Sequence, residues 1–517
     1  MNLRADPNSH SSPSNSIHVL PDEEHNRRLV DNIRPSNWNN PKPTGRYNLV
    51  VIGAGTAGLV SAAGAAGLGA KVALIERHLL GGDCLNFGCV PSKALIRSAR
   101  AWANVRDARQ FGIKVPPGVC VDFGEVMSRM RRLRAEISPL DSADRFRELG
   151  VDVFLGQATF SGPDTIQVGG QTLRFKRAVI ATGARASTPP IPGLDAVGFL
   201  TNETVFSLTE LPRRLAVIGA GAIGCELAQA FMRFGSEVHL IEVASGILPN
   251  EDRDAANLVD KSLQSDGVCI ICGATNLQVS STSDGKRLVF TSNGSPHEIL
   301  VDEILVGAGR KPNVEELGLE NAGVAYDKSG VQVDDRLRTK NRRIFAAGDI
   351  CSRFKFTHAA DAMARIVIQN SLFFGRAKVS ALKIPWCTYT DPEIAHVGLY
   401  EKEAQAKGWK TTTFEHQFRD IDRAILDGET EGFIRVLLKQ GTDRILGATI
   451  VGSHAGNMIS EISLAMVGGL GLKTIGRTIH PYPTQAECIK KIADAYNRSR
   501  LSPRIKSLFT SWLAWTR

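Results

Sequence analysis

A glycine-rich turn occurs twice in this chain with the same surroundings, and this repeat constrains the fold more than any other feature. "YNLVVIGAGTAGLVSAAGAAGLGAKVALIE" and "RLAVIGAGAIGCELAQAFMRFGSEVHLIE" each read as a buried strand, a glycine turn, a small-residue helix and a second strand ending in glutamate. The interval from the first glycine to that glutamate is 23 residues in both, Gly53 to Glu76 and Gly219 to Glu242. Two dinucleotide-binding units in one chain are therefore predicted.

The glycines of each turn have separate physical roles. The first permits the tight turn, the second lets the backbone approach a pyrophosphate, and the third lets the helix pack on the strand. The helix N-terminus offers N–H groups and a positive dipole end to the phosphates, and the glutamate reaches the ribose hydroxyls. The expected nucleotide contacts are Gly53, Gly55, Gly58 and Glu76 in the first unit and Gly219, Gly221, Gly224 and Glu242 in the second.

The residues after Glu242 indicate which nucleotide the second unit prefers. They read "VASGILPNED" and contain no Arg or Lys that could meet a 2′-phosphate. We therefore expect NADH rather than NADPH.

Composition places the chain among multi-domain globular proteins. Its 517 residues are 43% hydrophobic, enough to bury several cores. Nine cysteines are too few for a disulfide-stapled secreted protein, the N-terminus has no apolar stretch typical of a signal peptide, and no run reaches the roughly 18 to 20 apolar residues of a membrane span. A cytoplasmic location is predicted.

The net charge of +9 is concentrated at the C-terminus. Residues 490–517 hold seven Lys or Arg against Asp494 alone, and the rest of the chain is nearly balanced. This distribution is not a general phosphate-binding field, so no nucleic-acid partner is expected.

The stretch "GGDCLNFGCVPSK" holds Cys84 and Cys89 with four residues between them. A disulfide closing so short a loop removes little chain entropy, so chemistry is a better reason for the pair than stability. Pro91 suits the first turn of a helix, which places Cys89 at a helix N-terminus, where the pKa of a thiol falls. The alternatives are a buried free pair and half of a zinc site, although the CxxC pair elsewhere, Cys269 and Cys272, lies in an apolar, strand-like run that favours core packing.

The motifs "GGDCLNFGCVPSK", "ATGA", "GAGRKPN", "AAGD" and "TDPEIAHVGL" follow one another in this order. Over residues 46 to 495 the chain thereby resembles the pyridine nucleotide-disulfide oxidoreductases, the family of lipoamide dehydrogenase, glutathione reductase and mercuric reductase. The resemblance implies that the first unit binds FAD, that the second binds NAD(P)H, and that the last domain forms a homodimer interface.

The resemblance also implies roles for single residues. Cys89 would contact the flavin, and Cys84 would exchange with the substrate. Lys93 and Glu226 would sit beside the flavin N5, with surface charge as their alternative role. Three further cofactor contacts are expected from the motifs: Gly183 of "ATGA", Gly309 of "GAGRKPN" and Asp349 of "AAGD".

The predicted fold class is α/β, with two Rossmann-like dinucleotide-binding domains and a C-terminal α+β dimerisation domain. The expected boundaries are a disordered polar extension (1–45), the first part of the FAD-binding domain (46–187), the NAD(P)H-binding domain (188–312), the second part of the FAD-binding domain (313–382), the dimerisation domain (383–495) and a basic amphipathic tail (496–517).

The acceptor is indicated by "HPYPTQAE". Disulfide reductases of the family carry a histidine five residues before a glutamate, whereas here Tyr482 stands five before Glu487 and His480 seven before it. A tyrosine, with a pKa of about 10, is a slow base at neutral pH. Mercuric reductases are similar to the chain at this point, which implies Hg2+ as acceptor, held transiently by the soft thiolates of Cys84 and Cys89, with Tyr482 and Glu487 as catalytic residues.

Two other functions remain open. One is the reduction of a small or protein disulfide, with His480 as the base. The other is a membrane-surface flavoprotein adaptor, because the tail places Leu508, Trp512 and Trp515 at helical spacing among basic residues. The same tail could instead dock onto the dimer.

Overall fold

The first glycine turn lies between β1 (Arg46–Ile52) and α2 (Thr56–Gly67), and α2 leads into β2 (Val72–Glu76). Strand β2 is buried throughout, and β1 is apolar and buried from Leu49 to Ile52, as expected for parallel strands covered on both faces. The sheet order is β3-β2-β1-β6-β5-β4, and β18 joins it beside β6. The bounds of the other strands are β3 (Val151–Leu155), β4 (Thr159–Gly162), β5 (Thr165–Val168), β6 (Gln171–Ile180) and β18 (Ile344–Ala346).

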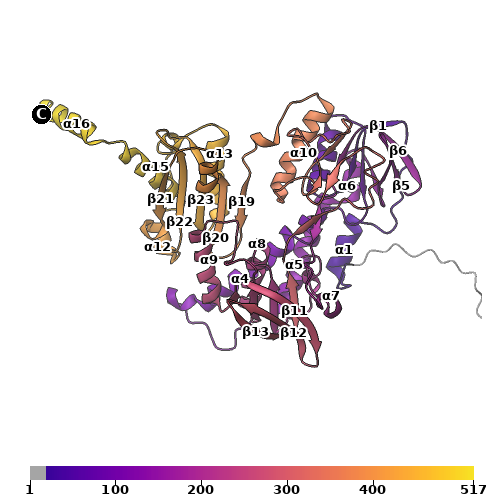
Figure 1. Ribbon diagram of the computed structural model, residues 1–517, viewed down its shortest axis with the longest axis horizontal. Coiled ribbons are helices and arrows are strands. Elements are labelled where there is room, and N and C mark those ends of the chain that lie inside the picture. The colour runs from indigo at the N-terminus through magenta and orange to yellow at the C-terminus, as the bar shows by residue number, and fades with distance from the viewer. Residues whose placement is uncertain (1–18) are drawn as a thin grey trace, which may run out of the picture.

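The second glycine turn repeats this plan between β8 (Arg214–Ile218) and α8 (Ala222–Phe234), followed by β9 (Glu237–Ile241). Its sheet is parallel, with the order β10-β9-β8-β14. An antiparallel sheet, β11-β12-β13, packs nearby as part of the lower lobe in Figure 1. The remaining bounds are α9 (Arg253–Asp266), β10 (Cys269–Ile271), β11 (Ala274–Thr282), β12 (Gly285–Ser292), β13 (Ser295–Val301) and β14 (Glu303–Val306).

The chain leaves the first unit and returns to it at one place. β7 (Ala184–Ala186) pairs antiparallel with β15 (Arg310–Pro312), so the segment that leaves the first unit and the segment that returns to it run side by side. After the return, β18 completes the first sheet and α10 (Thr357–Leu372) packs against α2. The second unit is therefore inserted into the first.

The C-terminal lobe is an antiparallel sheet covered by helices. Its order is β19-β20-β23-β22-β21, and a core including Ile434, Ile450, Ile462 and Ile492 lies between the sheet and its helices. The prediction of an α/β fold with a C-terminal α+β domain is confirmed. The bounds are β19 (Pro385–Thr388), β20 (Glu393–Gly398), β21 (Thr411–Gln417), β22 (Phe433–Lys439), β23 (Ile445–Gly452), α13 (Ala455–Val467) and α15 (Glu487–Ser499).

Helices of the first lobe connect its sheet to the second unit and to the N-terminus. The computed structural model describes residues 19–517. Within it, α4 packs against both α8 and α5, and α5 packs against α1. These helices are α1 (Glu24–Ile33), α3 (Gly82–Asn86), α4 (Cys89–Arg106), α5 (Phe123–Ile137) and α6 (Ala143–Glu148).

The expectation of a disordered extension over residues 1–45 is wrong for its described part. Helix α1 buries Leu29 and Ile33 in the core of the first lobe, and Glu23 caps the helix by accepting a hydrogen bond from the Asn26 N–H at 3.1 Å. Burial of these few apolar side chains orders a segment whose average composition is polar. Residues 1–18, the remainder of the expected extension, lie outside the described residues.

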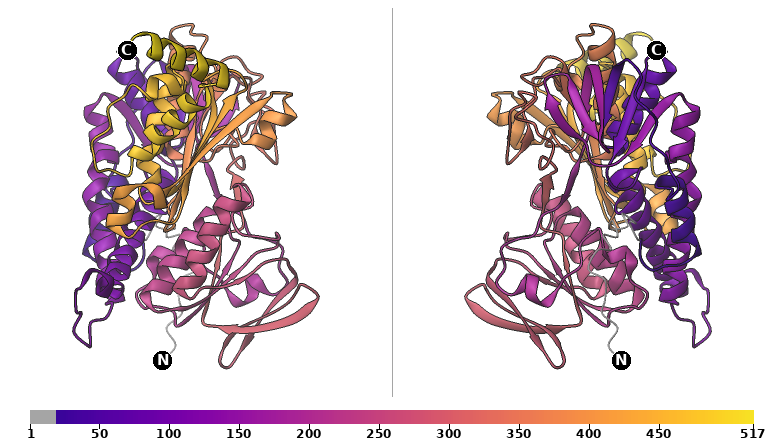
Figure 2. Two further views of the ribbon diagram at one scale, coloured as in Figure 1. Left: turned by 90° about the vertical axis from the view of Figure 1, so that its left-hand side faces the viewer. Right: turned by 90° about the vertical axis from the view of Figure 1, so that its right-hand side faces the viewer.

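The tail forms a separate helix, α16 (Pro503–Trp515), that projects beyond the C-terminal lobe in Figure 1 and is seen near the C label in Figure 2. Ser502 caps it, accepting from the Ile505 N–H at 3.3 Å, and Pro503 occupies the first turn. Every residue of α16 has an exposed or partly exposed side chain in the described structure. No helix within residues 19–517 is long and apolar enough to cross a bilayer.

Candidate active site

The glycine turns have the close contacts that their spacing predicts. A Cβ on Gly58 would lie 1.8 Å from the carbonyl oxygen of Gly53, and one on Gly224 would lie 1.9 Å from that of Gly219. Gly53 also has φ +97°, and a Cβ there would lie 2.5 Å from the carbonyl oxygen of Ala181. Any larger residue at these positions would push the helix away from the strand.

The two terminal glutamates are held in matching ways. Glu76 Oε2 accepts a hydrogen bond from the Ala54 N–H at 2.6 Å, and Glu242 Oε2 accepts one from the Ala220 N–H at the same distance. Both carboxylates are buried beside their turns. Burial raises the pKa of Glu76, and the backbone N–H groups of Ala54 and His78 oppose that rise.

The residues around each turn fit a dinucleotide. Gly55 and Gly221 are the N-caps of α2 and α8, and neither helix has a side-chain cap, so the first N–H groups are available to a phosphate. Gly183 has φ +67° with open space around its Cβ position, and Gly309 has φ +113° with its nearest neighbour 4.0 Å away. Glycine backbone thus lines both turns, which leaves a pyrophosphate room to approach the N–H groups.

Cys84 and Cys89 lie side by side as free thiols. Helix α4 begins at Cys89, as predicted, with Pro91 in its first turn. A hydrogen bond from the Cys84 thiol lowers the pKa of Cys89 to about 6, with the Thr357 hydroxyl, 3.3 Å from the Cys89 sulfur, and the charge of Lys93 contributing. The same contact and burial raise the pKa of Cys84. The pair therefore combines a reactive thiolate with a protonated neighbour.

Lys93 and Glu226 form an ion pair, with Lys93 Nζ 2.8 Å from Glu226 Oε2. Lys93 lies one turn after Cys89 on α4, and Glu226 lies on α8 of the second unit. Tyr389 completes the group: its N–H donates to Glu226 Oε1 at 2.8 Å, and its ring centroid lies 4.5 Å from Lys93 Nζ. Burial raises the pKa of Tyr389 to about 12, which keeps its phenol neutral.

Asp83, next to Cys84, joins the cysteine loop to two other segments. Its carboxylate pairs with Arg310 at 3.1 Å and accepts from the Asn202 side chain at 2.8 Å. Arg310 also lies 3.6 Å from Asp349. Burial raises the pKa of Asp349, and the positive charge of Arg310 opposes that rise. Arg310 Nε is buried without a hydrogen-bond partner among the described residues, so a cofactor oxygen could satisfy it.

Sequence reasoning missed Asp83, Arg310 and Thr357 as site residues. Asp83 and Arg310 stand inside motifs that had been singled out, "GGDC" and "GAGRKPN", and their charge was the available signal. Thr357 lies 268 residues from Cys89 in sequence and gives no local signal.

The residues expected to serve the acceptor lie on the C-terminal lobe and are not joined to one another. Tyr482 is 71% exposed, and its hydroxyl donates to Asp422 at 2.9 Å. Glu487 pairs with Lys491 at 3.2 Å. The side chain of His480 is 5% exposed, and its Nε2 lies 3.2 Å from Glu461.

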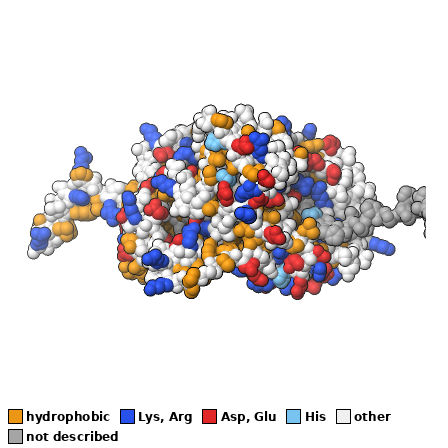
Figure 3. All heavy atoms as spheres, turned by 90° about the horizontal axis from the view of Figure 1, so that it is seen from below, with side chains coloured by type: hydrophobic (Ala, Val, Ile, Leu, Met, Phe, Trp, Pro, Cys, Tyr) orange, Lys and Arg blue, Asp and Glu red, His pale blue; other side chains and the backbone are white. Residues whose placement is uncertain are grey.

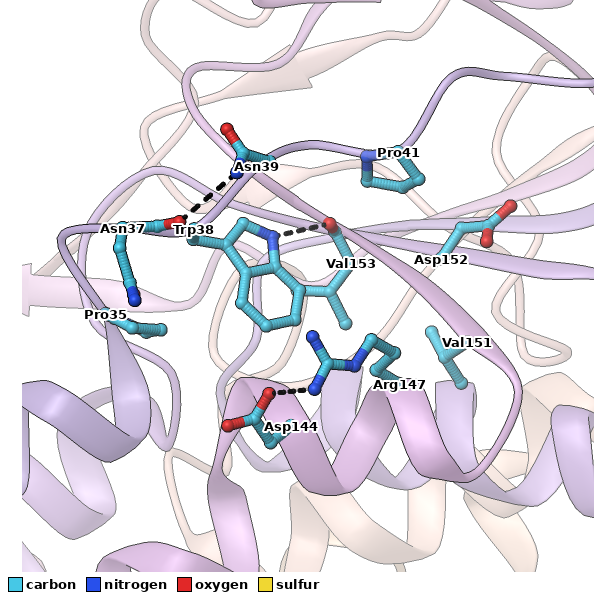
Figure 4. A pocket seen from close by; sticks show the side chains of 10 residues that line it. All are labelled: Pro35, Asn37, Trp38, Asn39, Pro41, Asp144, Arg147, Val151, Asp152 and Val153. Atoms are coloured by element: carbon cyan, nitrogen blue, oxygen red, sulfur yellow. Dashed lines mark hydrogen bonds and ion pairs between the residues drawn. The ribbon is translucent and has the colours of Figure 1, made fainter.

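Within residues 19–517, no group of three or more His, Cys, Asp or Glu side chains is arranged to hold a metal ion. A cavity of about 380 Å³ lies away from the cysteines, between the segment 35–41 and the residues of α6 and β3 (Figure 4). The site of interest is therefore the cysteine pair with its charged neighbours.

Comparison with known proteins identifies the domains. Residues 47–364 match the pyridine nucleotide-disulphide oxidoreductase model, and residues 384–493 match the dimerisation domain of the same family. A mercuric reductase from Staphylococcus aureus is 35% identical over 461 residues, which is 89% of this chain and 84% of that protein. A dihydrolipoyl dehydrogenase from Bacillus subtilis (strain 168) is 34% identical over 466 residues, 86% of this chain and 97% of that protein.

Solved structures agree with the sequence relatives. The Cu(II) complex of the HOCl-induced flavoprotein disulfide reductase RclA from Escherichia coli superposes with a TM-score of 0.76 at 28% identity, covering 87% of this chain and 100% of that one. The family is FAD-dependent and uses NAD(P)H, and its dimerisation domain supports a homodimer. On the family models and these relatives, the chain belongs to the pyridine nucleotide-disulphide oxidoreductases.

Proposed function

We propose that this protein is an NADH-dependent flavin-dithiol oxidoreductase of the cytoplasm whose acceptor is Hg2+. The observation that carries the proposal is the pair of free thiols at the start of α4, where contact with Cys84 lowers the pKa of Cys89 to about 6 and the same contact and burial raise the pKa of Cys84. Two cysteine sulfurs at one site bind a soft ion such as Hg2+ strongly as thiolates, and metal binding releases the proton of the Cys84 thiol. Relatives named mercuric reductase support this acceptor.

The proposed reaction moves two electrons from NADH to Hg2+, giving NAD+, one proton and Hg0. FAD, when bound, would relay the electron pair from the nicotinamide to the cysteine disulfide. Gly53, Gly55, Gly58, Glu76 and Asp349 would hold FAD. Lys93 and Glu226 would keep a fixed pair of charges beside it. Cys89 would lie toward the flavin and Cys84 toward the acceptor.

NADH is proposed rather than NADPH because of Glu242. Its buried carboxylate stands where the adenosine ribose is expected and would repel a 2′-phosphate. Arg253, the nearest arginine after Glu242 in sequence, donates instead to the carbonyl oxygens of Ile247, Leu248 and Glu251. Gly219, Gly221, Gly224 and Gly309 would line the path of the nucleotide.

Metal reduction needs less proton handling than disulfide cleavage, which suits the residues of the C-terminal lobe. Tyr482 is exposed and would present a hydroxyl to the metal site, with Glu487 nearby in sequence at the start of α15.

An acceptor panel tests this function. NADH absorbance is followed for purified protein with Hg2+ and excess small thiol, with lipoamide, or with glutathione disulfide. We expect consumption with Hg2+ that disappears in Cys84→Ala and persists in Cys120→Ala, a variant of an exposed cysteine elsewhere. If NADH is consumed with a disulfide and not with Hg2+, the proposed acceptor is wrong and the disulfide takes its place.

The second candidate is disulfide reduction with His480 as the base. The observation in its favour is the 3.2 Å contact between His480 and Glu461, since a carboxylate orients an imidazole for proton transfer. Relatives named dihydrolipoyl dehydrogenase agree with it. Loss of lipoamide activity in His480→Gln, with Hg2+ activity retained, would establish this role.

We further propose that α16 contacts an anionic membrane surface. At about 100° per residue, its apolar side chains cover an arc of about 160°. Arg504 and Lys506 flank that arc on its two sides, and no acidic residue follows Asp494. Figure 3 shows basic and apolar side chains on this projection. The apolar residues are Ile505, Leu508, Phe509, Trp512, Leu513 and Trp515.

Such a pattern is typical of helices that lie in the headgroup region, with basic residues toward anionic lipid. The protein should sediment with phosphatidylglycerol vesicles and not with phosphatidylcholine vesicles, and Trp512→Ser with Trp515→Ser should abolish sedimentation. The contrary result is a wild-type protein that binds neither kind of vesicle and a double variant that no longer forms the dimer. That result would show that α16 contacts the partner subunit and not a membrane.

A further inference from the structure

The segment that joins Glu76 to Cys84 is held from outside by the N-terminal helix and the residue after it. Arg34 Nη1 donates to the carbonyl oxygens of Arg77 at 3.0 Å and His78 at 2.7 Å. The Leu80 N–H donates to the carbonyl oxygen of Ile33 at 3.4 Å. The end of α1 therefore contacts the chain between the adenosine-side glutamate and the redox cysteine.

A buried relay reaches further, to the residue between the two cysteines. Asn26 on α1 accepts a hydrogen bond from Arg134 Nη2 at 2.6 Å. Arg134 on α5 donates from Nη1 to the carbonyl oxygen of Asn86 at 2.7 Å. Asn86 in turn donates from its side chain to the carbonyl oxygens of Leu80 at 3.0 Å and Gly82 at 2.9 Å.

All three members of this relay are shielded from water, with Asn26 and Arg134 2% exposed and Asn86 0% exposed. Within residues 19–517, Arg134 forms no ion pair, its contacts being an amide and a carbonyl oxygen. Burial lowers the pKa of Arg134 to about 10. An apolar side chain would fill this space with a smaller desolvation penalty. The two hydrogen bonds of the guanidinium, to Asn26 and to the Asn86 carbonyl, therefore explain why an arginine is present.

The other end of the segment is fixed to the edge of the first sheet. Trp38 Nε1 donates to the carbonyl oxygen of Val153 at 3.1 Å, as Figure 4 shows. Asn40 pairs with Leu155 through its side chain, accepting from the N–H at 2.7 Å and donating to the carbonyl oxygen at 3.0 Å. Residues 24–40 are thus anchored both at β3 and at the cysteine loop.

We propose that Asn26 and Arg134 are positioning residues for the redox pair: by holding the Asn86 carbonyl, they fix the loop in which Cys84 hydrogen-bonds to Cys89. The proposal rests on the proposed dithiol function. It gives the N-terminal segment a role in the chemistry of cysteines some sixty residues away in sequence. Neither residue touches the sulfur atoms, so their effect passes through Asn86.

The test compares Arg134→Met and Asn26→Ala with the wild type in two measurements. One is the dithiol–disulfide equilibrium of Cys84 and Cys89 against dithiothreitol, and the other is the pH profile of Cys89 alkylation by iodoacetamide. We expect the equilibrium constant to change by about threefold or more and alkylation at pH 6.5 to slow by a similar factor, since a displaced Cys84 stabilises the thiolate less. Asn26→Asp keeps an acceptor for Arg134 and should restore wild-type behaviour.

Arg132→Met is the matched control, because Arg132 lies on the same helix, is exposed and, among the described residues, pairs only with Glu136 at 2.7 Å. A lower melting temperature in Asn26→Ala with both profiles unchanged would overturn the inference and leave the relay a purely structural feature. Asn26→Ala keeps the Arg134 guanidinium and removes only the acceptor that orients it toward Asn86, so it provides the test if Arg134→Met fails to fold. A wild type that forms no Cys84–Cys89 disulfide would contradict the proposed function itself, a distinguishable result.

Discussion

Lys93 Nζ lies 2.8 Å from Glu226 Oε2, and this ion pair joins the helix that begins at Cys89 to the helix that follows the second glycine turn. Tyr389, from the C-terminal lobe, donates its N–H to the same carboxylate. All three lobes therefore meet within one turn of Cys89. Substitutions here should affect stability and thiol chemistry together.

Lys93→Met should destabilise the protein by roughly 2 to 3 kcal/mol, because it leaves the buried Glu226 carboxylate without its counter-charge. Adding Glu226→Gln should recover part of that loss. Urea unfolding measures both, and Arg97→Met, an exposed position on the same helix, is the control. Additive losses in the double variant would mean that the pair has no energetic coupling.

Thr357→Val should raise the pKa of Cys89, because the thiolate loses the hydroxyl 3.3 Å away. Only the thiolate reacts with iodoacetamide, so the wild-type rate should increase with pH through a midpoint near 6 and then level off. In the variant the midpoint should move to a higher pH than in the wild type. An unchanged midpoint would show that the hydroxyl does not stabilise this thiolate.

Asp83→Asn should shift the same profile in the opposite direction. The Asp83 charge raises the pKa of Cys89, so its removal should move the alkylation midpoint below that of the wild type. The new amide can still accept from Asn202, which limits the structural change. A midpoint above the wild-type value would indicate that the Asp83–Arg310 contact, rather than the charge, controls the loop.

Gly58→Ala and Gly55→Ala should separate folding from cofactor retention. The Cβ of the first variant would lie 1.8 Å from a backbone oxygen, so we expect a loss of roughly 3 kcal/mol in unfolding free energy. The Cβ of the second has its nearest protein atom at 3.8 Å and should leave stability nearly unchanged. If the turn approaches a pyrophosphate, Gly55→Ala should nevertheless purify with less FAD, measured by flavin absorbance after denaturation.

Much of the fold could be predicted from local sequence, because its elements are marked by residues that have few substitutes. The interval from Gly53 to Glu76 and its repeat from Gly219 to Glu242 predict two similar units, and the structure gives their glutamates equivalent hydrogen bonds at 2.6 Å. A proline in a first turn likewise predicts the start of α4 at Cys89.

Contacts between residues that are far apart in the sequence could not be predicted in this way. Helix α1 reads as a polar segment because its stabilising partners, including Arg134, lie about a hundred residues later. Tyr482 and Glu487 have the sequence spacing of the family's catalytic pair, but the Tyr482 hydroxyl donates its hydrogen bond to Asp422, which is sixty residues away in the sequence. Spacing within one segment reports local geometry and says nothing of partners from another lobe.

The most direct test of the central claim maps the thiols that NADH creates. The oxidised, flavin-loaded protein is treated anaerobically with one equivalent of NADH, alkylated, and analysed by peptide mass spectrometry. We expect two newly modified thiols for each protomer, at Cys84 and Cys89, with the other seven cysteines unchanged. Oxidation of NADH without new modification at these two positions would contradict the claim that electrons reach this pair.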